Sequence, residues 1–142
     1  MKRLLVALIA LGMLSFYLSL TTATAQPTPE QAAQRATEEW LVLVDAEKHG
    51  ESWETAAQAF KSAVGKDQWT EAVKAARGPL GKQRSRKFKS ATYTKTLPGA
   101  PNGKYVVVVC ESQFDGELVR QETVTPMKDQ DGQWRVAGYF VK

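Results

Sequence analysis

Cysteine is almost absent from this sequence, in which Cys110 is the only one among 142 residues. A single cysteine cannot close an internal disulfide, so packing alone must hold the folded chain together. Cys110 also lies far from the N-terminal apolar segment, which excludes a lipoprotein-type cysteine next to a signal. We therefore expect no stable membrane anchor, and we interpret Cys110 as a small buried apolar residue.

Histidine is equally scarce, because His49 is the only one. A metal site needs several ligands, and neither a Ser/His/Asp set nor a Cys/His pair is identifiable. The sequence also has no phosphate-binding loop. We expect no metal ion and no cofactor.

Acidic residues are missing from the segment 72–110, which contains nine basic residues. One interpretation is a surface that binds an anionic envelope component, such as lipid headgroups or cell-wall polymer. The alternative is structural, because lysines along a weak strand prevent edge-to-edge pairing. We do not expect a nucleic acid as the partner. The nine bases are Lys74, Arg77, Lys82, Arg84, Arg86, Lys87, Lys89, Lys95 and Lys104.

Only one long apolar run occurs, Leu4–Leu20, and it follows Lys2 and Arg3. Ala23-Thr24-Ala25 supplies the small-x-small triplet that signal peptidase recognises. An uncleaved anchor is the alternative, but polar residues interrupt an already short run. We predict a signal peptide over residues 1–25, cleaved after Ala25, and a periplasmic or secreted product.

Residues 26–142 have the length of one domain with one core. Their first part predicts three helices. Thr28 begins the first with a capping box, and Lys48, His49 and Gly50 supply its end. Ser52 is the expected cap of the second helix and Asp67 that of the third.

After Gly81 the periodicity changes to two and β-branched residues become frequent, which is typical of strands. The weakest expected strand covers 87–97 and the next covers 104–114. Asp115-Gly116 predicts a two-residue hairpin turn, which would place Val109 opposite Glu122. A second hairpin at Asp131-Gly132 would place Val124 opposite Tyr139.

Alternation then divides the side chains between two faces of an antiparallel meander. The face predicted to meet the helices carries Val106, Val108, Cys110, Phe114, Val119, Met127, Trp134, Val136 and Phe140. The opposite face would mix polar and apolar side chains, which is typical of a partner surface or a shallow groove. It would carry Tyr105, Val107, Val109, Glu111, Arg120, Glu122, Val124, Arg135 and Tyr139. The sequence thus predicts an α+β fold of three N-terminal helices on a four-stranded antiparallel sheet.

Several local motifs together resemble the exported bacterial family known as domain of unknown function 4019. The resemblance covers nearly all of residues 26–142, and it implies a family but no activity. Cys110 stands where a more ordinary strand residue is expected. The matching residues are Trp40, Gly50-Glu51-Ser52-Trp53, Phe60, Trp69, Arg77-Gly78-Pro79-Leu80-Gly81, Arg84, Leu97-Pro98-Gly99-Ala100-Pro101, Gly103-Lys104-Tyr105, Phe114, Glu122-Thr123-Val124 and Gly132-Gln133-Trp134-Arg135-Val136-Ala137-Gly138-Tyr139.

The order of helices and strands is also similar to the cone-shaped fold of the nuclear transport factor two and ketosteroid isomerase superfamily. That superfamily contains both enzymes and non-catalytic binding modules, so the likeness implies a fold and leaves the function open. Its members often dimerise through the outer sheet face. This implies a homodimer through the mixed face described above.

Two sets of candidate site residues follow. Glu122, Glu111 and Tyr139 are weak catalytic candidates, with Glu122 as a base and Tyr139 as an oxyanion donor. The structural alternative is a cross-strand salt bridge beside a dimer contact. Arg77, Arg84, Arg86 and Arg120 are the candidate binding residues.

Three hypotheses about function remain. The leading one is a non-catalytic binding or assembly module. The others are a small enzyme of the isomerase or hydratase type and a basic-patch module for anionic envelope components.

Overall fold

The computed structural model describes residues 24–142. The predicted signal peptide therefore lies almost entirely outside the described residues, and its cleavage stays a prediction. Among residues 24–142, no helix is long and apolar enough to cross a membrane.

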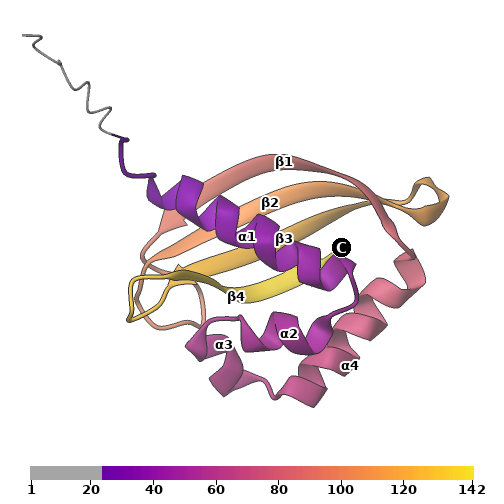
Figure 1. Ribbon diagram of the computed structural model, residues 1–142, viewed down its shortest axis with the longest axis horizontal. Coiled ribbons are helices and arrows are strands. Elements are labelled where there is room, and N and C mark those ends of the chain that lie inside the picture. The colour runs from indigo at the N-terminus through magenta and orange to yellow at the C-terminus, as the bar shows by residue number, and fades with distance from the viewer. Residues whose placement is uncertain (1–23) are drawn as a thin grey trace, which may run out of the picture.

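The helices come first and cover one face of the sheet (Figure 1). Helix α1 lies across that face, while α2, α3 and α4 lie along its β4 side (Figure 1). The helices are α1 (Pro29–Asp45), α2 (His49–Glu54), α3 (Gln58–Ala63) and α4 (Lys66–Arg77), followed by a short 3-10 turn, η1 (Gly78–Leu80).

The strands form one antiparallel meander in the order β1-β2-β3-β4. They are β1 (Gln83–Thr94), β2 (Tyr105–Phe114), β3 (Val119–Lys128) and β4 (Trp134–Val141), with the 3-10 turn η2 (Asp115–Glu117) between β2 and β3. The predicted α+β class with helices on one sheet face is confirmed.

Two helix boundaries differ from the prediction. The capping box of Thr28 and Gln31 forms as expected. Helix α1 then ends earlier, because Glu47 adopts a positive φ of 59° and the Lys48 N–H donates to the Leu43 carbonyl. His49 and Gly50 consequently lie in α2 and do not end α1.

The predicted second helix is divided into two short helices, α2 and α3. Ser52, its expected cap, is buried within α2 and does not cap a helix. Its hydroxyl donates to the His49 carbonyl and accepts from the Trp69 indole at 3.0 Å. The Ser52 carbonyl accepts from the Trp40 indole at 2.8 Å. Between α2 and α3 the backbone turns toward the sheet, where the Ala57 N–H donates to the Val136 carbonyl. Helix α4 is capped by Gly65, and Asp67 lies in its first turn.

The β2–β3 hairpin is one residue longer at its turn than predicted. Phe114 N–H donates to the Leu118 carbonyl, and Gly116 and Glu117 both have positive φ. Asp115 is held from the other side, because its carboxylate accepts from the Lys82 N–H and from Arg84. Glu122 therefore pairs with Cys110 and not with Val109.

A one-residue shift moves every side chain of a strand to the opposite face. The predicted face assignment is thus wrong for β3, where Glu122 and Val124 are fully buried and Val119 is 52% exposed. In β4 the predicted pairing of Val124 with Tyr139 is confirmed, but an irregularity beside Pro126 turns Tyr139 inward and leaves Phe140 exposed.

Aromatic rings fill the space between helices and sheet. Trp40 and Trp69 lie 5.8 Å apart between ring centroids, and both pack against Tyr139. Phe60 meets Trp69 edge to face at 5.1 Å. The interior of the cone is therefore packed around these rings.

Candidate functional site

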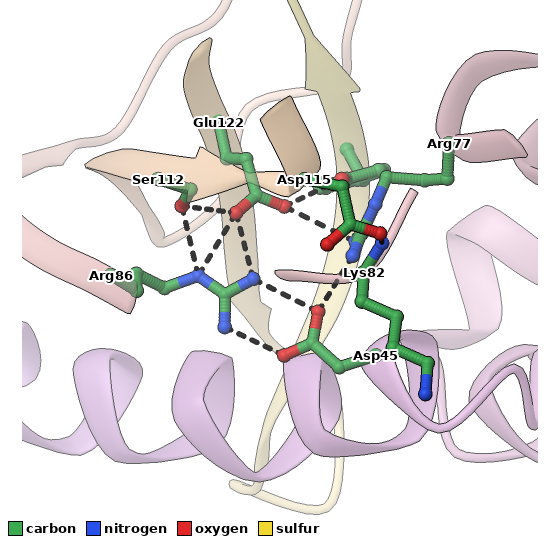
Figure 2. A network of polar contacts seen from close by, with 8 residues as sticks. Asp45, Arg77, Lys82, Arg86, Ser112, Asp115 and Glu122 are labelled. Atoms are coloured by element: carbon green, nitrogen blue, oxygen red, sulfur yellow. Dashed lines mark hydrogen bonds and ion pairs between the residues drawn. The ribbon is translucent and has the colours of Figure 1, made fainter. Parts of the chain in front are cut away.

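A buried network of charged and polar side chains is shown in Figure 2. Tyr139 connects it to the aromatic core. Each member comes from a different element, so the network joins two helices to all four strands. The members are Asp45 (α1), Arg77 (α4), Arg86 (β1), Ser112 (β2), Glu122 (β3) and Tyr139 (β4).

Glu122 is the centre of the network and is fully buried. Its Oε1 accepts from Arg86 Nη2 at 2.7 Å, from Arg86 Nε at 2.9 Å and from the Ser112 hydroxyl. Its Oε2 accepts from the Tyr139 hydroxyl at 2.6 Å and from Arg77 Nη1 at 3.4 Å. A carboxylate has about four lone-pair positions, so Glu122 has none left for another group.

Asp45 bridges the two arginines at the end of α1. It accepts from Arg77 Nη2 at 2.8 Å and from Arg86 at 2.8 and 3.0 Å (Figure 2). Burial raises the pKa of Asp45, but the hydrogen bonds from Arg86 and Arg77 outweigh it, so the net pKa lies below its usual value. Two guanidinium groups and two carboxylates balance in charge, which lets this cluster be buried.

The two network arginines remain protonated. Burial lowers the pKa of both Arg77 and Arg86, yet their anionic neighbours and hydrogen-bond acceptors more than compensate, so both values lie above the ordinary one. Arg77 also lies 4.8 Å from the centre of the Phe114 ring, a cation–π contact. Its Nε atom is buried and makes no hydrogen bond within residues 24–142.

Tyr139 stays neutral and donates to Glu122. Burial is the largest cause of its raised pKa, and the charge of Glu122 adds to it. The phenol is thus the donor in this pair and does not act as a base at ordinary pH.

The predicted site residues separate into two groups. The structure brings Glu122 and Tyr139 together, as expected, but on the helix-facing side and not on the outer face. Glu111 is exposed and pairs in register with Gln121. Within residues 24–142, the Arg120 side chain makes one hydrogen bond, to the Val119 carbonyl. The predicted convergence of Glu111 and Arg120 with Glu122 is therefore wrong.

The four binding candidates separate likewise. Arg77 and Arg86 both enter the network, whereas Arg84 is exposed and pairs with Asp115. Arg84 lies at the irregularity of β1 between Gln83 and Ser85, which interrupts the alternation between Arg84 and Arg86. Sequence reasoning missed Asp45 and Ser112. Arg77 contacts Asp45 at 2.8 Å across 32 residues of sequence, and no local pattern indicates this partner.

An open cleft of about 550 Å³ lies beside the network, between the ends of α1 and α4 and the start of β1. Asp45 and Arg77 form its inner wall, and its rim carries polar and charged residues from the surrounding turns. These are Glu47, His49, Lys74, Lys82, Gln83 and Asp115, and the two glycines Gly78 and Gly81 also line the cleft. Burial lowers the pKa of His49, and Lys74 and Arg77 act in the same direction. No cluster of metal-ligating side chains occurs among residues 24–142.

The comparison with protein families decides which family this is. Residues 36–139 match the model of the protein family of unknown function DUF4019. The chain belongs to DUF4019. The matched range contains all six residues of the buried network.

Solved structures resemble this DUF4019 chain in fold. A protein from Catenulispora acidiphila superposes with a TM-score of 0.51 at 11% identity, over 78% of this chain and 88% of that one. A candidate ketosteroid isomerase from Shewanella frigidimarina NCIMB 400 gives 0.49 at 12% identity, over 81% and 98%. A search of curated proteins finds no match. At these identities the likeness concerns the fold, in agreement with the expected cone, and not the activity.

Proposed function

We propose that this protein is a non-catalytic binding module that holds a small anionic ligand in the cleft beside the buried network. The observation that carries the proposal is the state of Glu122. Its carboxylate is fully buried and accepts five hydrogen bonds from four side chains. A general base needs a free lone pair within reach of a substrate proton, and Glu122 has none.

The cleft is the concave surface best placed to accept a ligand. Arg77 and Asp45 line it, whereas Glu122 does not. Ligand sites typically combine such a concavity with a few fixed polar groups. The network would serve as the rigid support of the cleft wall.

Charge supports an anion as the ligand. The two aspartates of the cleft are already engaged, Asp45 by two arginines and Asp115 by Arg84 and the Lys82 N–H. Lys82 has no ion-pair partner within residues 24–142, and Lys74 has only an exposed contact with Glu71 at 3.7 Å. Glu47 also lines the cleft and has no ion-pair partner within residues 24–142, so Lys74 and Lys82 exceed the unpaired acids of the cleft by one charge. This excess favours a small carboxylate or phosphate.

The test is a titration with inorganic phosphate followed by backbone amide chemical shifts. We expect saturable shifts confined to the cleft, and Lys82→Gln should weaken binding by roughly fivefold to tenfold, as loss of one charge-assisted hydrogen bond predicts. Lys89→Gln is the matched control, because Lys89 is an exposed lysine of β1 away from the cleft.

Equal weakening by Lys82→Gln and Lys89→Gln would show only a general effect of surface charge and would overturn the proposal. Shifts without saturation, spread over the whole surface, would do the same.

A further inference from the structure

A second, smaller pocket lies between α1 and the edge strand β1, away from the cleft. Its volume is about 200 Å³, and Leu41, Phe88, Val108 and Cys110 form most of its wall. Gln34, Glu38 and Arg86 also line it, and the first two are joined by a hydrogen bond of 2.9 Å. Dry apolar cavities of about 150 Å³ are known to take up molecules the size of benzene, so this volume suits a compact organic molecule.

Among the polar residues that line this pocket, Thr37 is distinguished by a buried hydroxyl without a hydrogen-bond partner in the described part of the chain. The Thr37 side chain lines the pocket and is 1% exposed, and its Oγ1 makes no hydrogen bond within residues 24–142. Buried hydroxyls nearly always have a partner, and a helical threonine usually bonds to the carbonyl one turn earlier. An unsatisfied hydroxyl against an apolar cavity therefore marks a place where a ligand can supply the missing hydrogen bond.

Two further wall residues favour an apolar ligand body. Phe88 remains 39% exposed although it faces the helices, so part of its ring is available for contact. Cys110 contributes a polarizable sulfur at 3% exposure. Burial raises the pKa of the Cys110 thiol, which keeps it neutral and unreactive.

We propose that this pocket binds a small neutral alcohol, whose hydroxyl pairs with Thr37 and whose apolar body packs on Leu41, Phe88 and Cys110. An anionic ligand is disfavoured, because Arg86, the cation that lines the pocket, is already paired with Asp45 and Glu122. This proposal is independent of the anion-binding cleft, which shares no lining residue with this pocket.

The experiment compares cyclopentanol with cyclopentane, which differ by a single hydroxyl. Each probe is titrated into the protein, and the side-chain resonances of Thr37, Leu41 and Cys110 are followed by NMR. Cyclopentanol should give saturable shifts at these residues and bind more tightly than cyclopentane.

Thr37→Val is the decisive variant, since valine keeps the shape of threonine without the hydroxyl. It should weaken cyclopentanol roughly fivefold, the worth of one neutral hydrogen bond, and leave cyclopentane unchanged. Thr37→Ser retains the hydroxyl and should keep the preference for the alcohol. The circular dichroism of both variants checks that they fold.

Three outcomes would overturn the proposal. One is the absence of saturable shifts in the pocket with cyclopentanol. Another is equal weakening of both probes by Thr37→Val, which would indicate a change of pocket shape. The third is unchanged cyclopentanol binding in Thr37→Val, which would leave the hydroxyl without a role.

Discussion

Glu122 and Glu111 are two glutamates on neighbouring strands with opposite surroundings. Replacing Glu122 with Gln leaves two buried arginines facing one aspartate, and removal of one partner of a buried ion pair typically costs about 3–5 kcal/mol. We expect a loss of that size in the free energy of unfolding, measured with urea. Glu111→Gln is the control, because exposed substitutions usually change stability by less than about 0.5 kcal/mol. Similar values for the two variants would contradict the structural role given to Glu122.

The residue scale also shows what the sequence could predict. The capping box at Thr28 was predictable because both partners lie within four residues. Ser52 fits the pattern of a helix cap, yet its hydroxyl serves Trp69, seventeen residues away. Asp45 gives no local signal at all, since its partners are 32 and 41 residues distant. Short-range hydrogen bonds can be predicted from the sequence, whereas a partner set by tertiary packing cannot.

At the scale of elements, Gly81 determines how η1 joins β1. Its φ is +73°, and a Cβ at this position would lie 2.5 Å from Asp115 Oδ2 and 2.8 Å from Asp115 Cβ. Gly81→Ala should therefore destabilise the fold by about 2 kcal/mol or more, through backbone strain and displacement of Asp115. Gly78, three residues earlier, has helical backbone angles, and a Cβ added there would have no atom within 4 Å. Gly78→Ala is therefore the matched control.

Gly78→Ala should leave stability unchanged or raise it slightly, because alanine restricts the conformations of the unfolded chain. Thermal unfolding of the two variants measures the difference. Equal midpoints would show that Asp115 moves aside without penalty.

A one-residue error in a predicted turn length reverses the predicted facing of the whole strand that follows. All four strands and their order follow from the alternating sequence, and so does the pairing of Val124 with Tyr139. The hairpin at Asp115-Gly116 was predicted with two loop residues, but Asp115 is held by the N–H of Lys82, just before β1, and by Arg84 of β1. That contact is long-range, and the length of the turn decides which face Glu122 occupies. The sequence therefore predicts the strands and not the facing of β3.

At the scale of the whole molecule, acid should weaken the fold. The pKa of Asp45 is lowered, so its contribution to stability is complete above its ordinary value near pH 4 and disappears as the pH falls through its lower folded value. The exposed Asp131 behaves likewise, with a pKa lowered to about 2, mainly by its hydrogen bond with Arg135. Urea unfolding between pH 5 and pH 2 should show a falling midpoint.

Asp45→Asn separates the network from the surface acids. The variant should start from a lower stability at pH 5 and lose less of it on acidification, because the side chain no longer titrates. A pH dependence as steep as that of the unmodified protein would place the acid sensitivity elsewhere in the chain.

The outer sheet face remains a predicted homodimer surface, with a composition different from that expected. Glu122 and Tyr139 are absent from it, and Phe140 stands there 53% exposed. A substitution at Tyr139 would therefore disturb the interior and not this face. The edge strand β1 carries Lys87 and Lys89, as the structural interpretation of the basic segment requires.

The buried network also bears on the order in which the chain acquires its structure. Arg77 and Tyr139 are 62 residues apart, and Arg86 and Glu122 are 36 apart, so no local segment can satisfy these charges alone. In a partly folded chain without β4, the Tyr139 hydroxyl would not lie beside Glu122, and the Glu122 carboxylate would lack one hydrogen-bond donor. Intermediates are thereby penalised, and contacts between distant segments slow the search for the native state. The same six side chains that close the end of the core thus favour a single cooperative folding transition, completed when β4 pairs with β3.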